Sequence, residues 1–137
     1  MSTAPAVRIP PVPALLPGTV RPELCLNDRS GAVWELLPAP AEGLPAVDAA
    51  CQDLPDGALP REGWVPVAVP SELVMQGFDI ENNVEYLCRR RVEVPADFAG
   101  ARVLVRFDGV YSNARVWADG RLVGAHVGGF TTWDCDV

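Results

Sequence analysis

The side chains best suited to acid and base chemistry in this 137-residue chain are its carboxylates. Two carboxyl groups roughly 5 to 9 Å apart can cleave a glycosidic bond held between them. The candidates lie in predicted loops or, in one case, at a strand end: Glu72, Asp79, Glu81, Glu85 and Asp108. No two of them form a recognisable acid/base or nucleophile motif, so we assign no catalytic residue.

Metal and redox chemistry have little support in the sequence. His126 is the only histidine, and no second His or Cys lies near it to complete a metal site. The four cysteines are far apart and form no CxxC pair: Cys25, Cys51, Cys88 and Cys135. Unpaired cysteine is among the most buried residue types, so we interpret them as buried free thiols. We therefore expect neither a metal ion nor a cofactor.

The charge balance argues against a nucleic-acid partner. Eleven basic residues, all of them arginine, face eighteen carboxylates, which leaves a net charge of -7. Binding to a phosphate backbone depends on clustered Lys and Arg, which this chain lacks. Neutral ligands such as sugars remain compatible with this balance.

The N-terminal residues do not resemble a leader or an anchor. Prolines break each apolar run before it reaches the length of a signal-peptide core or a membrane span: Pro5, Pro10, Pro11, Pro13 and Pro17. We therefore expect a cytoplasmic protein without a membrane partner.

The elements that must position any site begin after an irregular region. Residues 1–22 are rich in Pro and Ala and predict an extended tail, because proline lacks the amide donor that a helix or a ladder needs. Residues 23–137 have the apolar content of one domain, with a long surface loop over 38–63. No segment has a helical period over three turns, and no internal repeat is evident.

Short β-branched runs separated by turn residues predict an antiparallel, all-β domain. In the clearest strand, Val103, Val105 and Phe107 lie on one face and Arg102, Leu104 and Arg106 on the other, which is a half-buried pattern. Asp119-Gly120 supplies the two positive-φ positions of a tight hairpin turn. The predicted strands span residues 65–69, 89–94, 102–107, 113–118, 121–123 and 130–137.

Three linked motifs carry a family resemblance. The run from Phe107 to Gly124, FDGVYSNARVWADGRLVG, and the run from His126 to Thr131, HVGGFT, resemble the F-x-G-V, V-W-x-N-G and G-x-H-x-G-G-F-T motifs of glycoside hydrolase family 2, the β-galactosidase, β-glucuronidase and β-mannosidase group. Residues 69–79 and 89–95 resemble further segments of its N-terminal domain, and residues 24–37 do so more weakly. The residues that we assign to these structural motifs are Gly109, Trp117, Gly120, Gly124, His126, Gly128, Gly129 and Phe130.

The resemblance implies a galactose-binding-like jelly-roll β-sandwich that packs against a catalytic (β/α)8 barrel. In the family this sandwich continues past the segment that matches residues 133–137. The resemblance therefore leads us to expect a domain truncated at its C-terminus, without its last strand or strands.

The resemblance also assigns candidate substrate-binding residues. Asn82 and Asn83, which follow Asp79, match the loop that offers an amide to sugar hydroxyls in β-galactosidase-like members, and an amide can donate and accept hydrogen bonds. An ordinary asparagine turn is the alternative. For His126 the family position favours a structural, hydrogen-bonded role over catalysis.

Aromatic side chains could stack on sugar rings. Trp117 and Trp133 lie in predicted strands and are typical of core or interface residues. Trp34 could also stack, but Trp64, beside Gly63 at a loop edge, is the best candidate for an exposed sugar platform.

The resemblance thus predicts the N-terminal sugar-binding domain of a β-galactosidase-like enzyme that hydrolyses O-glycosyl bonds in carbohydrate metabolism. The catalytic barrel and an immunoglobulin-like domain would lie further along the same enzyme, so this chain alone is expected to be inactive. Two alternatives stay open: a stand-alone carbohydrate-binding module, and a non-functional fragment. Fold alone does not decide between them.

Overall fold

A computed structural model describes residues 22–27, 33–38, 53–54 and 59–137. The predicted N-terminal tail falls outside these residues apart from Pro22, and Cys51 and much of the predicted loop over 38–63 also fall outside them.

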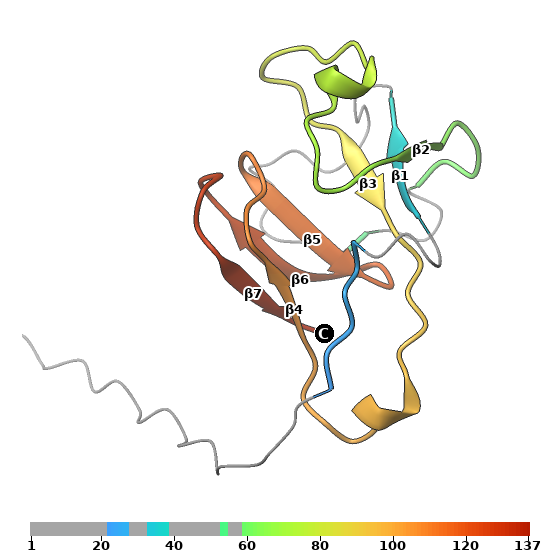
Figure 1. The fold of residues 1–137 in the computed structure, drawn as a ribbon, viewed down its shortest axis with the longest axis vertical. Helices are drawn as coiled ribbons and strands as arrows, with labels where there is room; N and C mark the ends of the chain where they lie inside the picture. The colour runs from blue at the N-terminus through green and yellow to red at the C-terminus, as the bar shows by residue number, and fades with distance from the viewer. Residues whose placement is uncertain (1–21, 28–32, 39–52, 55–58) are drawn as a thin grey trace, which may run out of the picture.

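The described residues form an antiparallel, all-β structure, which confirms the predicted fold class (Figure 1). The strands are β1 (Trp34–Leu37), β2 (Val65–Val67), β3 (Leu87–Arg89), β4 (Leu104–Phe107), β5 (Ala114–Ala118), β6 (Arg121–His126) and β7 (Trp133–Asp136). Two single-turn 3₁₀ helices, η1 (Val74–Gln76) and η2 (Ala96–Phe98), lie in the connections.

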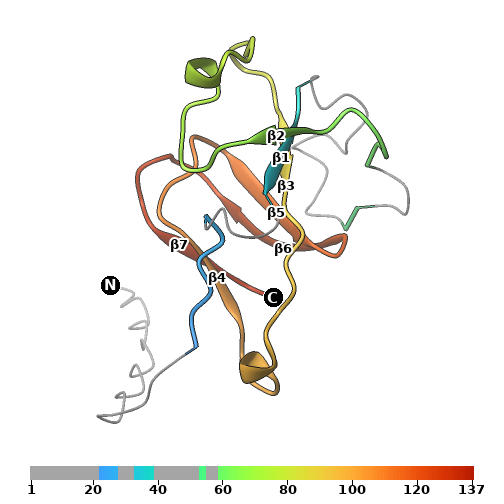
Figure 2. The same ribbon diagram turned by 45° about the vertical axis from the view of Figure 1, so that its right-hand side comes forward.

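The strands pair in three antiparallel groups with the orders β2-β1-β3, β4-β7 and β5-β6. Strands β6 and β7 contact each other, so the β5-β6 and β4-β7 pairs pack together (Figure 2). This arrangement is consistent with a β-sandwich. The finer jelly-roll connectivity stays a prediction.

The hairpin predicted at Asp119-Gly120 is present. Asp119 and Gly120 have φ values of 48° and 83°, and Ala118 pairs with Arg121 across the turn. Two hydrogen bonds join residues 53–54 to this hairpin. The Leu54 amide donates to the Gly120 carbonyl at 2.7 Å, and the Leu122 amide donates to the Asp53 carboxylate at 2.7 Å. A segment far away in the sequence thus forms hydrogen bonds with the backbone of this turn.

The face assignment of the 102–107 strand is also confirmed. Val103, Val105 and Phe107 are half-buried, whereas Leu104 and Arg106 are exposed. Among the described residues the buried apolar side chains are few: Leu36 in β1, Val67 in β2 and Cys135 in β7.

Two predictions from the sequence are wrong. The strand expected over 89–94 lies at Leu87–Arg89 instead, because β3 pairs with the four-residue β1, where Leu37 is opposite Leu87 and Glu35 is opposite Arg89. Val92 and Val94 beyond it are exposed.

The second wrong prediction is that all the cysteine thiols are buried. Cys135 is buried as expected, but Cys25 and Cys88 are exposed, because Cys25 lies in a segment outside the strands and Cys88 faces outward on β3.

Candidate functional site

Two connecting loops at one end of strands β4 to β7 carry four of the predicted motif residues: Gly109, Gly128, Gly129 and Phe130. The loop after β4, residues 108–113, lies beside the loop after β6, residues 127–132 (Figures 1 and 2). The connection from β2 to β3 carries Asp79, Asn82 and Asn83. An ion pair between Arg115 of β5 and Glu85 of that connection, with 2.6 Å between Nη2 and Oε2, links the two regions.

The predicted substrate-binding asparagines lie in an exposed turn before β3. Asn82, Asn83 and Asp79 are all exposed, and Asn83 has a left-handed φ of 60°. The Glu81 amide donates to the Tyr86 hydroxyl at 3.0 Å, which closes the turn. Their side chains can therefore reach a ligand from solvent, although the same left-handed conformation is what an ordinary asparagine turn would show.

The start of this connection is held by Gln76 in η1. Its side-chain amide accepts from the Ala68 amide at 2.8 Å and donates to the Ala68 carbonyl at 3.1 Å. The Gln76 side chain thus forms the two hydrogen bonds with Ala68, just after β2, that the backbone of a neighbouring strand would otherwise form. This pairing anchors η1 and the loop that leads to Asn82.

Trp64, the predicted sugar platform, has one face of its ring covered. The Arg89 guanidinium lies 4.0 Å from the centre of its ring, and its indole nitrogen donates to the Pro60 carbonyl at 2.8 Å. Its role as a sugar platform stays a prediction.

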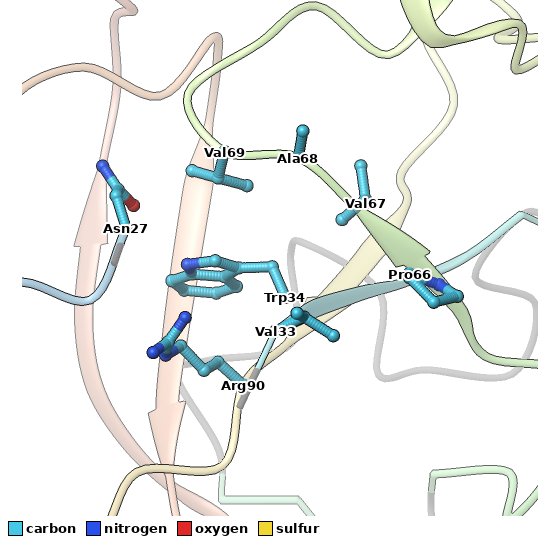
Figure 3. A pocket seen from close by; sticks show the side chains of 8 residues that line it. All are labelled: Asn27, Val33, Trp34, Pro66, Val67, Ala68, Val69 and Arg90. Atoms are coloured by element: carbon cyan, nitrogen blue, oxygen red, sulfur yellow. The ribbon is translucent and has the colours of Figure 1, made fainter. Parts of the chain in front are cut away.

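A shallow pocket of about 230 Å³ lies between β1, the end of β2 and the segment at 22–27 (Figure 3). In Figure 3 the Trp34 indole and the Arg90 side chain lie side by side, with Asn27 across from them. The Trp34 indole nitrogen donates to the Leu26 carbonyl at 3.0 Å. The remaining lining residues are Val33, Pro66, Val67, Ala68 and Val69. The pocket is thus mainly apolar, with one amide and one guanidinium.

His126 is part of a stack of rings beneath the loop at 127–132. Its Nε2 lies 2.9 Å from the Thr131 hydroxyl, across the base of the loop. Its ring stacks on Trp133 at 5.0 Å, and Trp133 stacks on Phe107 at 4.6 Å. In this geometry a ring nitrogen of His126 and its hydroxyl partner brace the loop.

Three of the motif glycines allow neighbouring segments of the same chain to approach closely. A Cβ on Gly109 would lie 2.9 Å from the Gly129 carbonyl oxygen, and one on Gly129 would lie 2.6 Å from Cδ2 of Tyr111. A Cβ on Gly124 would overlap the Cys135 sulfur. Gly120 and Gly128 instead have positive φ values, of 83° and 109°. Of the other motif residues, Trp117 lies mid-strand in β5, near Arg115.

The structure adds an exposed aromatic residue that sequence reasoning missed. Tyr111 pairs with the exposed motif residue Phe130 across the two loops, with ring centroids 5.9 Å apart. Both residues follow a glycine within three positions in predicted loops, a pattern that could have marked them as surface aromatics.

Other kinds of site have no geometric support in the part of the chain that the structure describes. Within it, no group of three or more His, Cys, Asp and Glu side chains is placed to hold a metal ion. The described helices include none of the length and apolarity that crossing a bilayer requires.

Comparison with known proteins gives a partial similarity to a glycosidase. The chain is 35% identical over 49 residues to a β-galactosidase from Thermoanaerobacter pseudethanolicus. The aligned segment covers 36% of this chain but only 7% of that relative. No family model and no solved structure matches the chain. The partial similarity indicates a relationship to glycoside hydrolases.

Proposed function

We propose that this chain is the N-terminal sugar-binding β-sandwich of a β-galactosidase-like glycoside hydrolase of family 2. The observation that carries the proposal is the 35% identity to a β-galactosidase over 49 residues. The antiparallel all-β fold and the motif run from Phe107 to Thr131 agree with it. On this proposal the two catalytic carboxylates belong to a barrel elsewhere in the enzyme.

The part of this chain that contacts substrate is the turn with Asp79, Asn82 and Asn83. Their side chains are exposed, and the turn is closed from below by Tyr86 and held at its start by Gln76. An amide that donates to one sugar hydroxyl and accepts from another discriminates by hydroxyl orientation. The chain thus orients the sugar, while the barrel supplies the acid and the nucleophile.

The binding role is tested by titrating the purified chain with methyl β-galactopyranoside, using methyl β-glucopyranoside and methyl β-mannopyranoside for comparison. Amide resonances of residues 79–86 should shift most with the galactoside. Asn83→Gly removes the amide side chain but keeps the left-handed backbone, so it should abolish these shifts without unfolding the turn. Asn83→Asp tolerates the same backbone and should weaken binding, because its carboxylate cannot donate.

The hydrolase assignment has two further tests. The purified chain should release no nitrophenol from chromogenic β-galactosides, since we assign it no catalytic pair. The coding sequence that follows Val137 should encode, in frame, a (β/α)8 barrel. Turnover by the chain itself, or sugar-independent spectra at residues 79–86, would contradict the proposal.

A further inference from the structure

Two aromatic rings are unusually exposed on the adjacent loops 108–113 and 127–132. Tyr111 is 82% exposed and Phe130 is 90% exposed, and their rings lie 5.9 Å apart at an interplanar angle of 55°. Val127, in the same loop as Phe130, is 82% exposed. Large aromatic side chains are usually buried for most of their surface, and an exposed apolar cluster commonly marks a binding site.

The backbones that carry the two rings are held against each other. The Cβ that Gly129 lacks would lie 3.1 Å from the Tyr111 Cα, and the Cβ that Gly109 lacks would lie 2.9 Å from the Gly129 carbonyl oxygen. The loops can approach this closely only because both positions are glycine. Tyr111 and Phe130 therefore stand on two loops in direct backbone contact.

His126 and Trp133, which flank the loop that carries Phe130, hold this loop in place. The Thr131 hydroxyl lies 2.9 Å from His126 Nε2, and His126 stacks on Trp133 with an interplanar angle of 11°. Trp133 in turn stacks on Phe107 at 19°. Such support reduces the entropy lost when the exposed rings bind a ligand, so it favours a preorganised site.

The polar groups beside the rings are neutral. Ser112, Asn113, Thr131 and Thr132 are exposed hydroxyl and amide residues in the same two loops. The loops contain no arginine, and Asp108 is their one charged residue. With a net charge of -7 on the chain, this surface disfavours phosphates, nucleic acids and anionic lipid headgroups. It suits a ligand with an apolar face and a rim of hydroxyls.

From this geometry we infer that Tyr111 and Phe130 form a stacking platform for one pyranose ring of a neutral saccharide. The C–H face of the sugar lies on the rings, and its hydroxyls meet the hydroxyl and amide side chains of the loops. The platform involves different residues from the Asn82-Asn83 turn. The Arg115–Glu85 ion pair joins β5, which follows the loop of Tyr111, to the connection that contains this turn. The inference rests on the proposed function for the class of its ligand.

The test is a titration of the whole chain with lactose and with methyl β-galactopyranoside, followed by NMR. Amides of residues 109–113 and 127–131 should shift, and saturation transfer should be strongest to the C–H protons on one face of the sugar. Tyr111→Ala and Phe130→Ala should each weaken binding about fivefold to tenfold, the loss expected for one aromatic contact. Tyr111→Phe and Phe130→Tyr keep a ring and should bind within about twofold of the wild type.

Met75→Ala is the matched control, because Met75 is 80% exposed on η1 and is not aromatic. It should leave binding unchanged. Shifts confined to residues 79–86 would overturn the platform and leave the proposed function standing. Unchanged binding in both alanine variants would also overturn it, as would concentration-dependent shifts of the two loops without sugar, which would indicate that a second copy of the chain covers the rings.

Discussion

Replacing Gly124 with alanine should destabilise the packing of β6 against β7. Gly124 lies in β6, and its missing Cβ would overlap the Sγ of Cys135 and lie 3.4 Å from Trp133 Cζ3. Cys135 is 1% exposed, so its sulfur cannot swing out into solvent. Extra atoms in such a contact force shifts that cost about 1–3 kcal/mol.

The net effect includes an opposing contribution from the backbone. Alanine is favoured over glycine within a strand by roughly 0.5–1 kcal/mol. The expected loss in the free energy of unfolding is therefore roughly 0–2.5 kcal/mol. Ala125→Gly, at the exposed neighbouring position in β6, measures the backbone contribution by itself and is the matched control.

Urea denaturation followed by tryptophan fluorescence gives these free energies, and Cys135→Ala completes a double-mutant cycle. Removing the sulfur should itself cost about 1–2 kcal/mol. In that background Gly124→Ala should stabilise the chain by roughly 0.5–1 kcal/mol, because only the backbone contribution is left, and the coupling should equal the overlap cost of about 1–3 kcal/mol. Additive effects of the two substitutions, with no coupling between them, would refute the close approach of β6 and β7.

Three further perturbations test other parts of the fold. Gly120→Val should destabilise the chain by about 1 kcal/mol or more in urea denaturation, because a β-branched residue cannot adopt its φ of 83°. Arg106 holds the pKa of the Asp134 carboxyl below its usual value, so this pair stabilises the chain above the usual carboxyl range and loses its effect as the pH falls through the lowered pKa. The contribution is small because both groups are exposed. In the Asp134→Asn variant the free energy of unfolding should therefore fall less steeply with decreasing pH than in the wild type. Iodoacetamide should alkylate the exposed Cys25 in the native chain and spare Cys135, whose pKa is raised by burial, as peptide mass spectrometry would show.

The sequence predicted features that depend on neighbouring residues alone. Asp119-Gly120 marked a hairpin because few residue pairs accept two successive positive φ values, and the hairpin is present. Alternation over residues 102–107 predicted which side chains face inward, because side chains in a strand alternate between its two faces. Local motifs also pointed to a glycoside hydrolase, and the partial similarity to a β-galactosidase agrees.

The limits of the third strand could not be predicted, because they depend on its partner. Strand β3 has only the four residues of β1 to pair with, so it ends at Arg89, although β-branched residues continue to Val94. The exposure of Cys25 and Cys88 likewise depends on what packs around them rather than on residue type.

Part of the candidate site could likewise be predicted from the local sequence, and part of it depends on the tertiary structure. Residue type and motif determined that Asn82 and Asn83 lie in an exposed turn, since local backbone preference suffices for that. Only the tertiary structure placed Tyr111 beside Phe130, nineteen positions further along the chain. Their contact needs two loops to meet at Gly109 and Gly129. The pairing of β4 with β7 and of β5 with β6 brings those loops together, because both loops run from one strand pair to the other. Such pairing is a property of the assembled strands, and no local pattern of residues specifies it.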